Sequence, residues 1–169
     1  LPTAAWLSLK TGMPNLMAWY PLFFLFVLVP ACDYALGHDS VNIEKSQEST
    51  ISNTFWFKAL TLMVLPVQIA SLIWSARWFV HQDLNWLGTI GWLFSQGIVS
   101  SILAINVAHE LIHKDAKLER AIGGILLTSV SYYGFKIEHL RGHHVHVSTP
   151  EDASSARFGQ SLWAFMPQA

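Results

Sequence analysis

Long apolar stretches alternate with short polar segments along this chain. Three of the stretches carry no charge apart from Arg77, and each is long enough for a helix across a hydrocarbon core, which takes about 20 residues. Their positions predict membrane spans at roughly 11–32, 59–79 and 84–108. The residues from Leu1 to Leu9 are also apolar, and we expect them to be the end of a further span. The pattern therefore predicts an all-α fold, a polytopic transmembrane helix bundle.

A fourth apolar stretch, at 121–135, is too short to cross the membrane. As a helix it would extend about 22 Å, whereas the hydrocarbon core is about 30 Å thick. We therefore expect a re-entrant or interfacial helix here. Such a helix leaves the polar segments before and after it on the same side of the membrane.

Basic residues are distributed unevenly between the two sides of the predicted bundle. If the spans alternate in direction, Lys10 and Arg77 lie on one side, and the other eight lysines and arginines lie on the opposite side. Membrane proteins keep lysine-rich and arginine-rich loops in the cytoplasm. The side with eight basic residues is thus predicted to be cytoplasmic, and it includes the polar segments that flank residues 121–135.

The composition excludes several other classes of protein. Hydrophobic residues make up 52% of the chain and charged residues only 12%, whereas about a quarter of a soluble domain is charged. The net charge is −1 and the basic residues form no stripe, so no nucleic-acid partner is expected. Cys32 is the single cysteine, which excludes an internal disulfide and a cysteine-based metal motif.

Histidines provide the candidate chemistry of this chain. Five of the eight fall in two groups, His109 and His113 in "HELIH" and His139, His143 and His144 in "EHLRGHH". Positions four apart share a face of an α-helix, so His109 with His113, and His139 with His143, are each expected to direct a pair of imidazoles at one metal. His144 is turned by about 100° from its neighbour and would reach a second metal.

The number of histidines favours a cluster of two metals. Neutral imidazole binds iron, copper, zinc and nickel, and five such ligands exceed the needs of one tetrahedral zinc. His38, His81 and His146 lie outside the two groups, and we expect them to form ordinary hydrogen bonds at the membrane interface. Four carboxylates lie close to the two groups in sequence and are candidates to orient the ligands: Glu110, Asp115, Glu138 and Asp152.

Two other metal-site classes fit part of the pattern. "HELIH" matches the HExxH signature of zinc proteases, in which the glutamate is the general base, so an intramembrane metalloprotease is an alternative. That reading leaves the second histidine group unexplained. A haem-binding electron carrier would place two histidines on opposite sides of the bundle, whereas these histidines cluster at the end of one predicted span.

Several motifs together resemble one family. "HELIHK" and "EHLRGHH", followed by "VSTPEDASSAR" and preceded by "LVPACDYALGHD", are similar to the integral-membrane alkane 1-monooxygenases, the AlkB-type alkane hydroxylases. These enzymes form a superfamily with the membrane fatty-acid desaturases and xylene monooxygenase. The resemblance covers nearly the whole chain.

The resemblance implies a membrane helix bundle with a cytoplasmic, histidine-rich, metal-binding region that holds two non-haem irons. Glu110 and Glu138 match the motif glutamates, and the resemblance gives them supporting roles around the ligands. The family also needs histidine motifs that this sequence does not contain. Residues 1–169 are therefore expected to be the N-terminal part of a single membrane hydroxylase domain, inactive alone. By match, five residues are iron ligands: His109, His113, His139, His143 and His144.

The activity implied by the resemblance is terminal hydroxylation of n-alkanes to 1-alkanols with O₂. Electrons would come from rubredoxin, which an NADH-dependent rubredoxin reductase reduces, and the enzyme would reside in the bacterial inner (cytoplasmic) membrane with its active site on the cytoplasmic side. Leu25 is the candidate for a residue in the substrate channel that limits chain length. The alternative from the same superfamily is a xylene (aromatic-methyl) monooxygenase or a fatty-acyl desaturase, which sequence alone does not distinguish.

Overall fold

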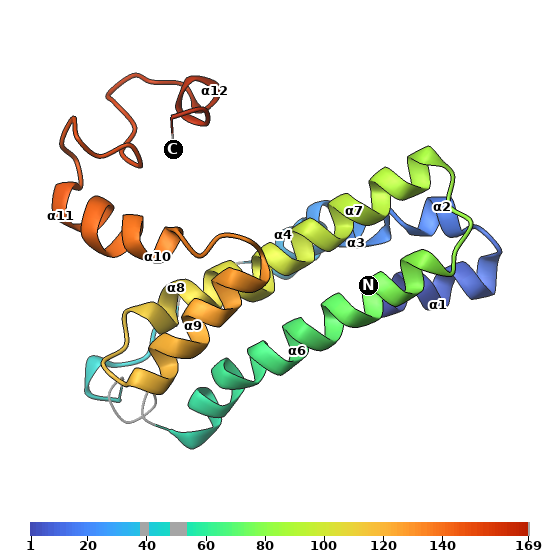
Figure 1. The fold of residues 1–169 in the computed structure, drawn as a ribbon, viewed down its shortest axis with the longest axis horizontal. Helices are drawn as coiled ribbons and strands as arrows, with labels where there is room; N and C mark the ends of the chain where they lie inside the picture. Colours follow the sequence, from blue (N-terminus) through green and yellow to red (C-terminus); the bar gives the residue numbers. More distant parts are fainter. Residues whose placement is uncertain (38–40, 48–53, 169) are drawn as a thin grey trace.

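The computed structural model describes residues 1–37, 41–47 and 54–168, and every regular element in these ranges is a helix. Figure 1 shows the order of the elements. The all-α fold class predicted from the sequence is confirmed. His38 and Asp39, and most of the polar linker between residues 37 and 54, lie outside the described residues.

Two long antiparallel helices form the frame of the molecule. The first is α6 (Phe55–Val80), and the second comprises α7 (Trp86–Ser100), η2 (Ser101–Asn106) and α8 (Val107–Ile112). Their lengths, 26 and 27 residues, and their apolar composition are sufficient for each to cross a membrane. The predicted span at 59–79 falls inside α6, and the predicted span at 84–108 overlaps the second helix, which begins two residues later at Trp86 and continues to Ile112. Figure 1 shows the two running side by side.

The predicted span at 11–32 differs from the structure, because the chain breaks near its start. Helix α1 (Pro2–Thr11) ends at Gly12, which has a left-handed φ of 66°. A glycine in this conformation stops a helix, and a proline two residues later begins a new one. The continuous apolar helix runs instead from Tyr20 to Leu36. Four short elements make up this region: α2 (Pro14–Met17), α3 (Tyr20–Phe23), η1 (Phe24–Leu28) and α4 (Val29–Leu36).

An aromatic cluster joins the N-terminal helices to the hairpin of α6 and α7. Trp92 is buried, and the ring of Trp78 lies 4.0 Å from it between centroids. Ser95 donates a hydrogen bond to the carbonyl of Ala18 at 2.7 Å, which ties α7 to the chain before α3. A Cβ at Gly91 would lie 2.4 Å from the indole nitrogen of Trp19, so only glycine permits this contact.

The second core lies where α8 meets α9 (Lys117–Ser129). Helix α9 is 13 residues long, about 20 Å, which is too short to cross a membrane. It folds back along α8, and Gly123 allows close approach to the carbonyl of Ala108. The buried side chains here are Ala104, Ala108, Leu111, Ile112, Leu126 and Leu127.

A third helical segment follows α9 and leads into the C-terminal region. It consists of α10 (Phe135–Ile137), η3 (Glu138–His143) and α11 (His144–His146), which join end to end. Turns then lead to α12 (Leu162–Phe165), where the Ser161 hydroxyl caps the helix by accepting from the Ala164 amide at 3.3 Å. Helix α9 runs back along α8, and the segment from α10 to α11 then returns the chain to the end of the bundle where α8 ends.

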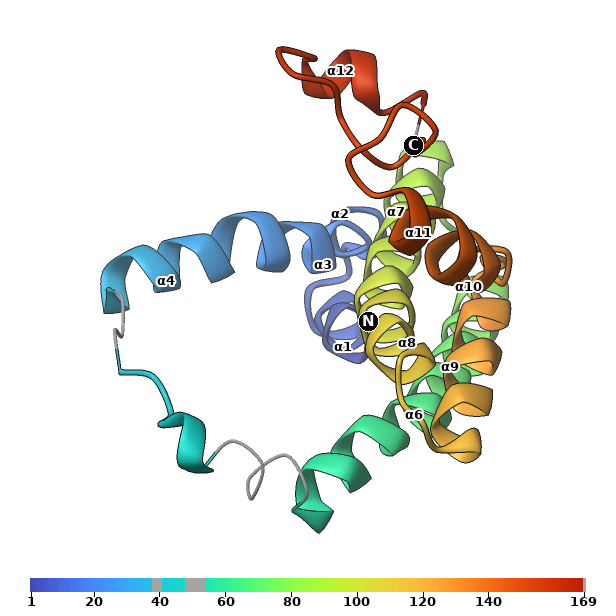
Figure 2. The same cartoon turned by 90° about the vertical axis from the view of Figure 1, so that its left-hand side faces the viewer.

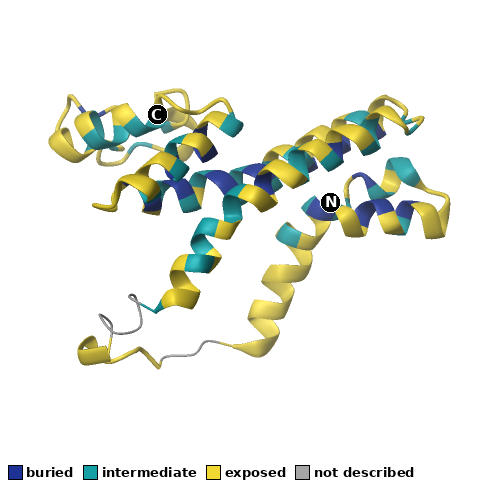
Figure 3. Cartoon of the chain, turned by 60° about the horizontal axis from the view of Figure 1, so that its bottom comes forward, coloured by how far each residue is buried: buried dark blue, intermediate teal, exposed yellow. Residues whose placement is uncertain are grey.

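Large apolar side chains cover much of the outside. Helix α4 projects away from the other helices, and all of its residues are exposed (Figures 2 and 3). On α6, Trp56, Phe57 and Leu60 are also exposed. Apolar surface of this extent is typical of contact with lipid or with further protein, not with water.

Candidate metal centre

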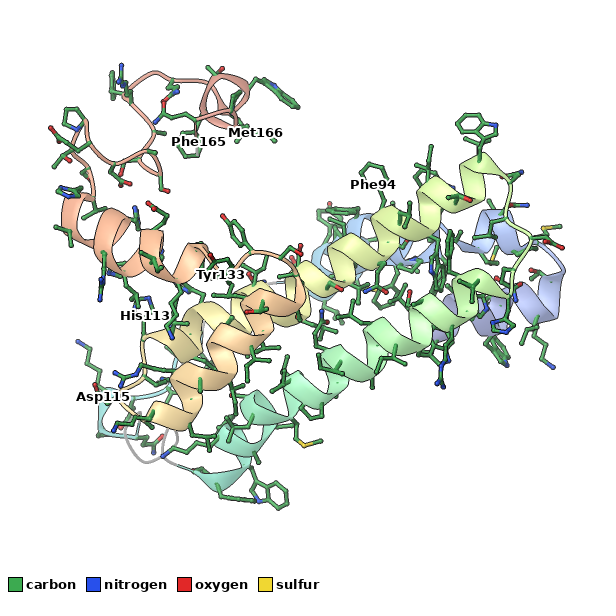
Figure 4. The ribbon with its side chains drawn as sticks, viewed as in Figure 1. Phe94, His113, Asp115, Tyr133, Phe165 and Met166 are labelled. Carbon is green, nitrogen blue, oxygen red and sulfur yellow. The ribbon has the colours of Figure 1, made fainter. Side chains whose placement is uncertain are left out.

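Two histidine-bearing segments meet where α8 turns back into α9. His109 lies on α8 and His113 caps the C-terminus of that helix. His139 and His144 lie on the segment formed by η3 and α11. One ligating nitrogen from each of these four side chains lies within 4.8 Å of the others. Figure 4 shows His113 in the space between the two segments.

His139 is at the centre of this cluster. Its Nε2 lies 2.8 Å from Nε2 of His109, 3.1 Å from Nε2 of His113 and 3.0 Å from Nε2 of His144. A neutral ring nitrogen either donates one hydrogen or accepts one, so it cannot satisfy three neighbours of its own kind by hydrogen bonding. The lone pairs of four imidazoles instead converge on one small region.

The spacing of these nitrogens fits a metal ion. With metal–nitrogen bonds of about 2.1 Å, adjacent ligand nitrogens lie about 3.0 Å apart at right angles and about 3.4 Å apart in a tetrahedron. The contacts of 2.8–3.1 Å around His139 match the first value. An all-imidazole donor set suits iron, copper, zinc or nickel and does not suit calcium or magnesium.

A π-helix determines which histidine of the second group joins the cluster. In an α-helix, the spacing of four residues would pair His139 with His143. Residues Glu138–His143 form a π-helix, in which hydrogen bonds join residues five apart. His139 therefore pairs with His144, and the pairing expected from α-helical spacing is wrong. π-Turns of this kind occur frequently at functional sites.

Two imidazoles of the cluster, those of His139 and His113, have pKa values lowered toward the neutral form that binds a metal. Burial, followed by the neighbouring positive charges of His109 and the other imidazoles, lowers the pKa of His139 to about 4. Burial and the charges of His144 and His109 also lower the pKa of His113, whereas Glu110 raises it. Because only deprotonated imidazole binds a metal, the site is prepared for one at neutral pH.

His143 is held outside the cluster by a buried carboxylate. Its Nδ1 lies 2.8 Å from Oδ2 of Asp152, and only 5% of Asp152 is exposed. The amide of Ser154 donates to Oδ1 of Asp152 at 3.0 Å, and the hydroxyl of Ser155 donates to Oδ2. The Ser155 hydrogen bond is the largest of the causes that lower the pKa of Asp152. An ionised Asp152 that accepts from Nδ1–H leaves Nε2 of His143 free to bind a metal.

The other three candidate carboxylates are more loosely placed. Oε1 of Glu110 lies 3.4 Å from Nδ1 of His109, and the Glu110 side chain is 69% exposed. Glu138 is exposed on η3. Asp115 is exposed in the turn between α8 and α9 (Figure 4). Of the four carboxylates, Asp152 therefore has the geometry of a group that orients a histidine ring. Glu110 is the next nearest of them to a histidine nitrogen.

An aromatic stack that the sequence analysis missed supports the cluster from one side. Phe135 lies parallel to the ring of His139, with centroids 4.7 Å apart and planes at 18°. Tyr132 stacks on Phe135 at 5.2 Å. The signal in the sequence was the spacing of four residues between Phe135 and His139, which places both rings on one helical face.

The remaining candidate residues lie apart from the cluster. Leu25, on η1, borders a cavity of about 250 Å³ that Val99 of α7 also lines. His81 follows α6 at the opposite end of the hairpin, where its Nδ1 lies 2.7 Å from the carbonyl of Arg77. His146 is exposed at the end of α11.

Comparison with known proteins gives two kinds of match. The fatty acid desaturase family matches residues 84–169, which contain both histidine groups. Alkane 1-monooxygenase 1 of Pseudomonas aeruginosa is 47% identical over the whole chain, and alkane 1-monooxygenase 2 of Alcanivorax borkumensis is 45% identical over the whole chain. The chain covers 45% and 44% of these two relatives, which is less than half of their length.

The chain is also similar to a more distant relative, which is named for a different substrate. The xylene/toluene monooxygenase hydroxylase component XylM of Pseudomonas putida is 28% identical over 49% of this chain, and 22% of that protein is covered. The family and the two long apolar helices together point to a membrane protein, and the convergent histidines point to a metal centre. The chain belongs to the fatty acid desaturase family, in which it is similar along its whole length to alkane 1-monooxygenases.

Proposed function

We propose that this chain is the N-terminal part of a membrane enzyme that hydroxylates the terminal methyl of n-alkanes to 1-alkanols with O₂ at a di-iron centre. The convergence of four imidazoles, in a chain similar throughout to alkane 1-monooxygenases, carries the proposal. An unactivated C–H bond offers nothing to a side-chain acid, base or nucleophile. When bound, the irons would supply the oxidising chemistry together with O₂.

The residues divide naturally between two irons. His109, His113, His139 and His144 would hold the first, because their nitrogens converge. His143, directed away by Asp152, would serve the second. Further ligands would come from the rest of the longer protein. Glu110 and Glu138 are assigned supporting roles around the ligands.

The chain's own residues keep the ligands in place before metal binds. Asp152 would fix His143 with its proton on Nδ1, and the stack of Phe135 on His139 would hold that ring in the cluster. The lowered pKa of His139 means that a metal need not displace a proton there near neutral pH.

The membrane would provide the route by which the substrate reaches the site, and the charged residues would determine which side of the membrane the site faces. An n-alkane partitions into the bilayer and would reach the site between helices, with Leu25 limiting the chain length. Lysines at the histidine end, such as Lys114, Lys117 and Lys136, favour the cytoplasmic side of the bacterial inner membrane. Electrons would arrive there from rubredoxin, reduced by its NADH-dependent reductase.

The protease and haem alternatives fit the geometry poorly. A protease of the HExxH type needs its glutamate beside the metal-bound water, but Glu110 is largely exposed and faces the outer nitrogen of His109. A haem would separate its two axial nitrogens by about 4 Å, from metal–nitrogen bonds of about 2 Å. The Nε2 atoms around His139 lie too close together for a porphyrin plane between them.

A second candidate function comes from the same family. The match to XylM supports hydroxylation of an aromatic methyl group, and the family match supports desaturation of a fatty acyl chain. Both reactions use the same metal chemistry and differ in the shape of the substrate channel. The stronger and longer similarity to alkane 1-monooxygenases favours the n-alkane.

The test uses cells that express the full-length protein with rubredoxin and its reductase. The cells receive n-alkanes and xylene together, and gas chromatography with mass spectrometry identifies the products. We expect 1-alkanols that disappear with His139→Ala and persist with the control His81→Ala, a histidine at the other end of the hairpin. Benzylic alcohol alone would support the second candidate, and no oxygenated product from iron-loaded protein would overturn both hydroxylase readings.

A further inference from the structure

The histidine cluster contains enough ligands to bind one metal ion by itself. Four imidazole nitrogens lie within 4.8 Å of one another. They belong to His109, His113, His139 and His144. Four nitrogen ligands complete a tetrahedral site, or leave open positions in a larger coordination shell. A single metal can therefore bind to the cluster without a further protein ligand.

Both segments that carry the cluster are anchored to the core between α8 and α9. Phe135 and Leu140, from the segment that bears His139, pack against the buried side chains of this core. Nζ of Lys136 also donates a hydrogen bond to the carbonyl of Arg120 on α9 at 3.2 Å. The packing that brings the four imidazoles together thus comes from helices close to them in sequence, and it is in place without a metal.

His143 has a separate support and lies outside the cluster. Its Nδ1 lies 2.8 Å from Oδ2 of Asp152, and Asp152 is held by hydrogen bonds from Ser154 and Ser155 in the turns after α11. In the described part of the chain, no second group of three or more metal-binding side chains has its ligand atoms close together. One imidazole alone does not hold a metal, so His143 depends on further ligands from the longer protein.

The two ligand sets are linked through the backbone between His143 and His144. These neighbours have ring centroids 5.7 Å apart and ring planes at 89°. A metal bound to His144 restrains the backbone of η3 and α11, which also carries His143. Ordering of His143 then costs less conformational entropy when a second metal binds. The first metal should therefore favour binding of the second.

We propose that the metal centre is assembled in two steps. One metal binds first, to the four-histidine cluster, and this step does not require His143 or Asp152. The second metal binds afterwards through His143, and its affinity depends on Asp152 and on the first metal. The inference rests on the proposed function for the presence of two metals, and it adds the order in which they bind.

The test counts bound metals during a titration. The full-length, metal-free protein in lipid nanodiscs is titrated with cobalt(II) in the absence of O₂. Visible absorption follows the cobalt sites, and native mass spectrometry counts the ions on each protein. We expect the form with one metal to predominate at one equivalent of cobalt(II) and the form with two metals to appear only beyond it.

Substitutions distinguish the two steps. His143→Ala should abolish the second step and leave the affinity of the first unchanged. Asp152→Asn should weaken the second step alone, by 10-fold to about 100-fold. His144→Ala should abolish the first step and also weaken the second. The matched control is His146→Ala, an exposed histidine at the end of α11, which should leave both steps unchanged.

A spectroscopic measurement on the unsubstituted protein keeps the proposal testable if a variant fails to fold. X-ray absorption at the cobalt edge, recorded at one equivalent, should show one kind of site with four imidazole ligands, as in the cluster. A mixture of two sites at this stage would overturn the proposed order.

Other outcomes separate the order of binding from the proposed function. A two-metal form that appears without a one-metal form, or loss of both steps in His143→Ala, would overturn the two-step assembly. Alkane hydroxylation can still be present in that case, because it depends on the completed centre. Two-step binding in a protein that forms no 1-alkanol would retain this inference and overturn the proposed reaction.

Discussion

His143 and the buried Asp152 form a pair in which Nδ1 of the half-buried imidazole lies 2.8 Å from Oδ2 of the carboxylate. This pair explains why His143 stands outside the cluster of four histidines although it is adjacent to His144 in sequence. The carboxylate also receives hydrogen bonds from Ser154 and Ser155, so its own position is fixed. Through these hydrogen bonds, Asp152 connects the turns after α11 to His143.

Replacement of Asp152 should weaken metal retention. Asp152→Asn keeps the shape but removes the charge that favours the proton on Nδ1, and loss of such a partner typically costs 10-fold to about 100-fold in metal affinity. Iron content after dialysis against a chelator, measured by plasma mass spectrometry, tests this. Glu151→Gln, at an exposed neighbouring carboxylate, is the control. Equal iron retention in both variants would show that Asp152 only shapes the turn.

The π-helical register predicts unequal effects of two nearby histidines. His144→Ala should remove a nitrogen that lies 3.0 Å from Nε2 of His139, whereas His146→Ala removes an exposed ring. We expect metal binding to fall sharply in the first variant and to be unchanged in the second. Titration with cobalt(II), followed by its visible absorption, measures both. Similar absorption from both variants would contradict the register of η3.

The metal-free protein should lose stability as the pH falls. His139 has a pKa of about 4 in the folded protein and about 6.5 when unfolded, because burial and neighbouring imidazoles disfavour its charged form. Between these values the unfolded state binds more protons, so the free energy of unfolding decreases from about pH 6.5 towards about pH 4. Thermal unfolding of metal-stripped protein across this range tests the sign. The slope should be smaller in His139→Asn, and an unchanged slope would assign it to other groups.

The close contact at Gly91 should be essential for packing of the N-terminal segment. In Gly91→Ala, the new Cβ would overlap the Trp19 indole, and overpacking of this kind costs about 1–3 kcal/mol. Gly97→Ala, on the same helix with nothing within 4 Å of its Cβ, should gain about 1 kcal/mol from helix propensity. Melting temperatures in matched detergent compare the two. A Gly91 variant as stable as the Gly97 variant would refute the contact.

A larger side chain at Leu25 should shift the chain-length preference. Leu25 borders the cavity of about 250 Å³, and a tryptophan there would fill part of it. We expect Leu25→Trp to favour shorter n-alkanes in whole-cell product profiles. Phe26→Trp, at the adjacent and 64% exposed position, should leave the profile unchanged. The same profile for both variants would remove Leu25 from the substrate channel.

The sequence by itself determined the helical class and indicated which two histidine groups could hold a metal. Stretches such as 84–108 are too apolar to be stable in water, and their length fits a membrane-spanning helix. The short stretch at 121–135 indicated that the chain returns to the same end of the bundle. Imidazoles in two close groups indicated a metal, because that chemistry depends on residue type and spacing alone.

Tertiary structure decided the features that depend on local backbone geometry and on contacts distant in sequence. Hydropathy does not register the left-handed stop at Gly12, so the sequence did not predict the break near the start of the first apolar stretch. Hydrogen bonds join residues five apart in a π-helix and four apart in an α-helix, and which of the two forms depends on packing that no residue pattern encodes. Nε2 of His144, and not a nitrogen of His143, therefore contacts Nε2 of His139.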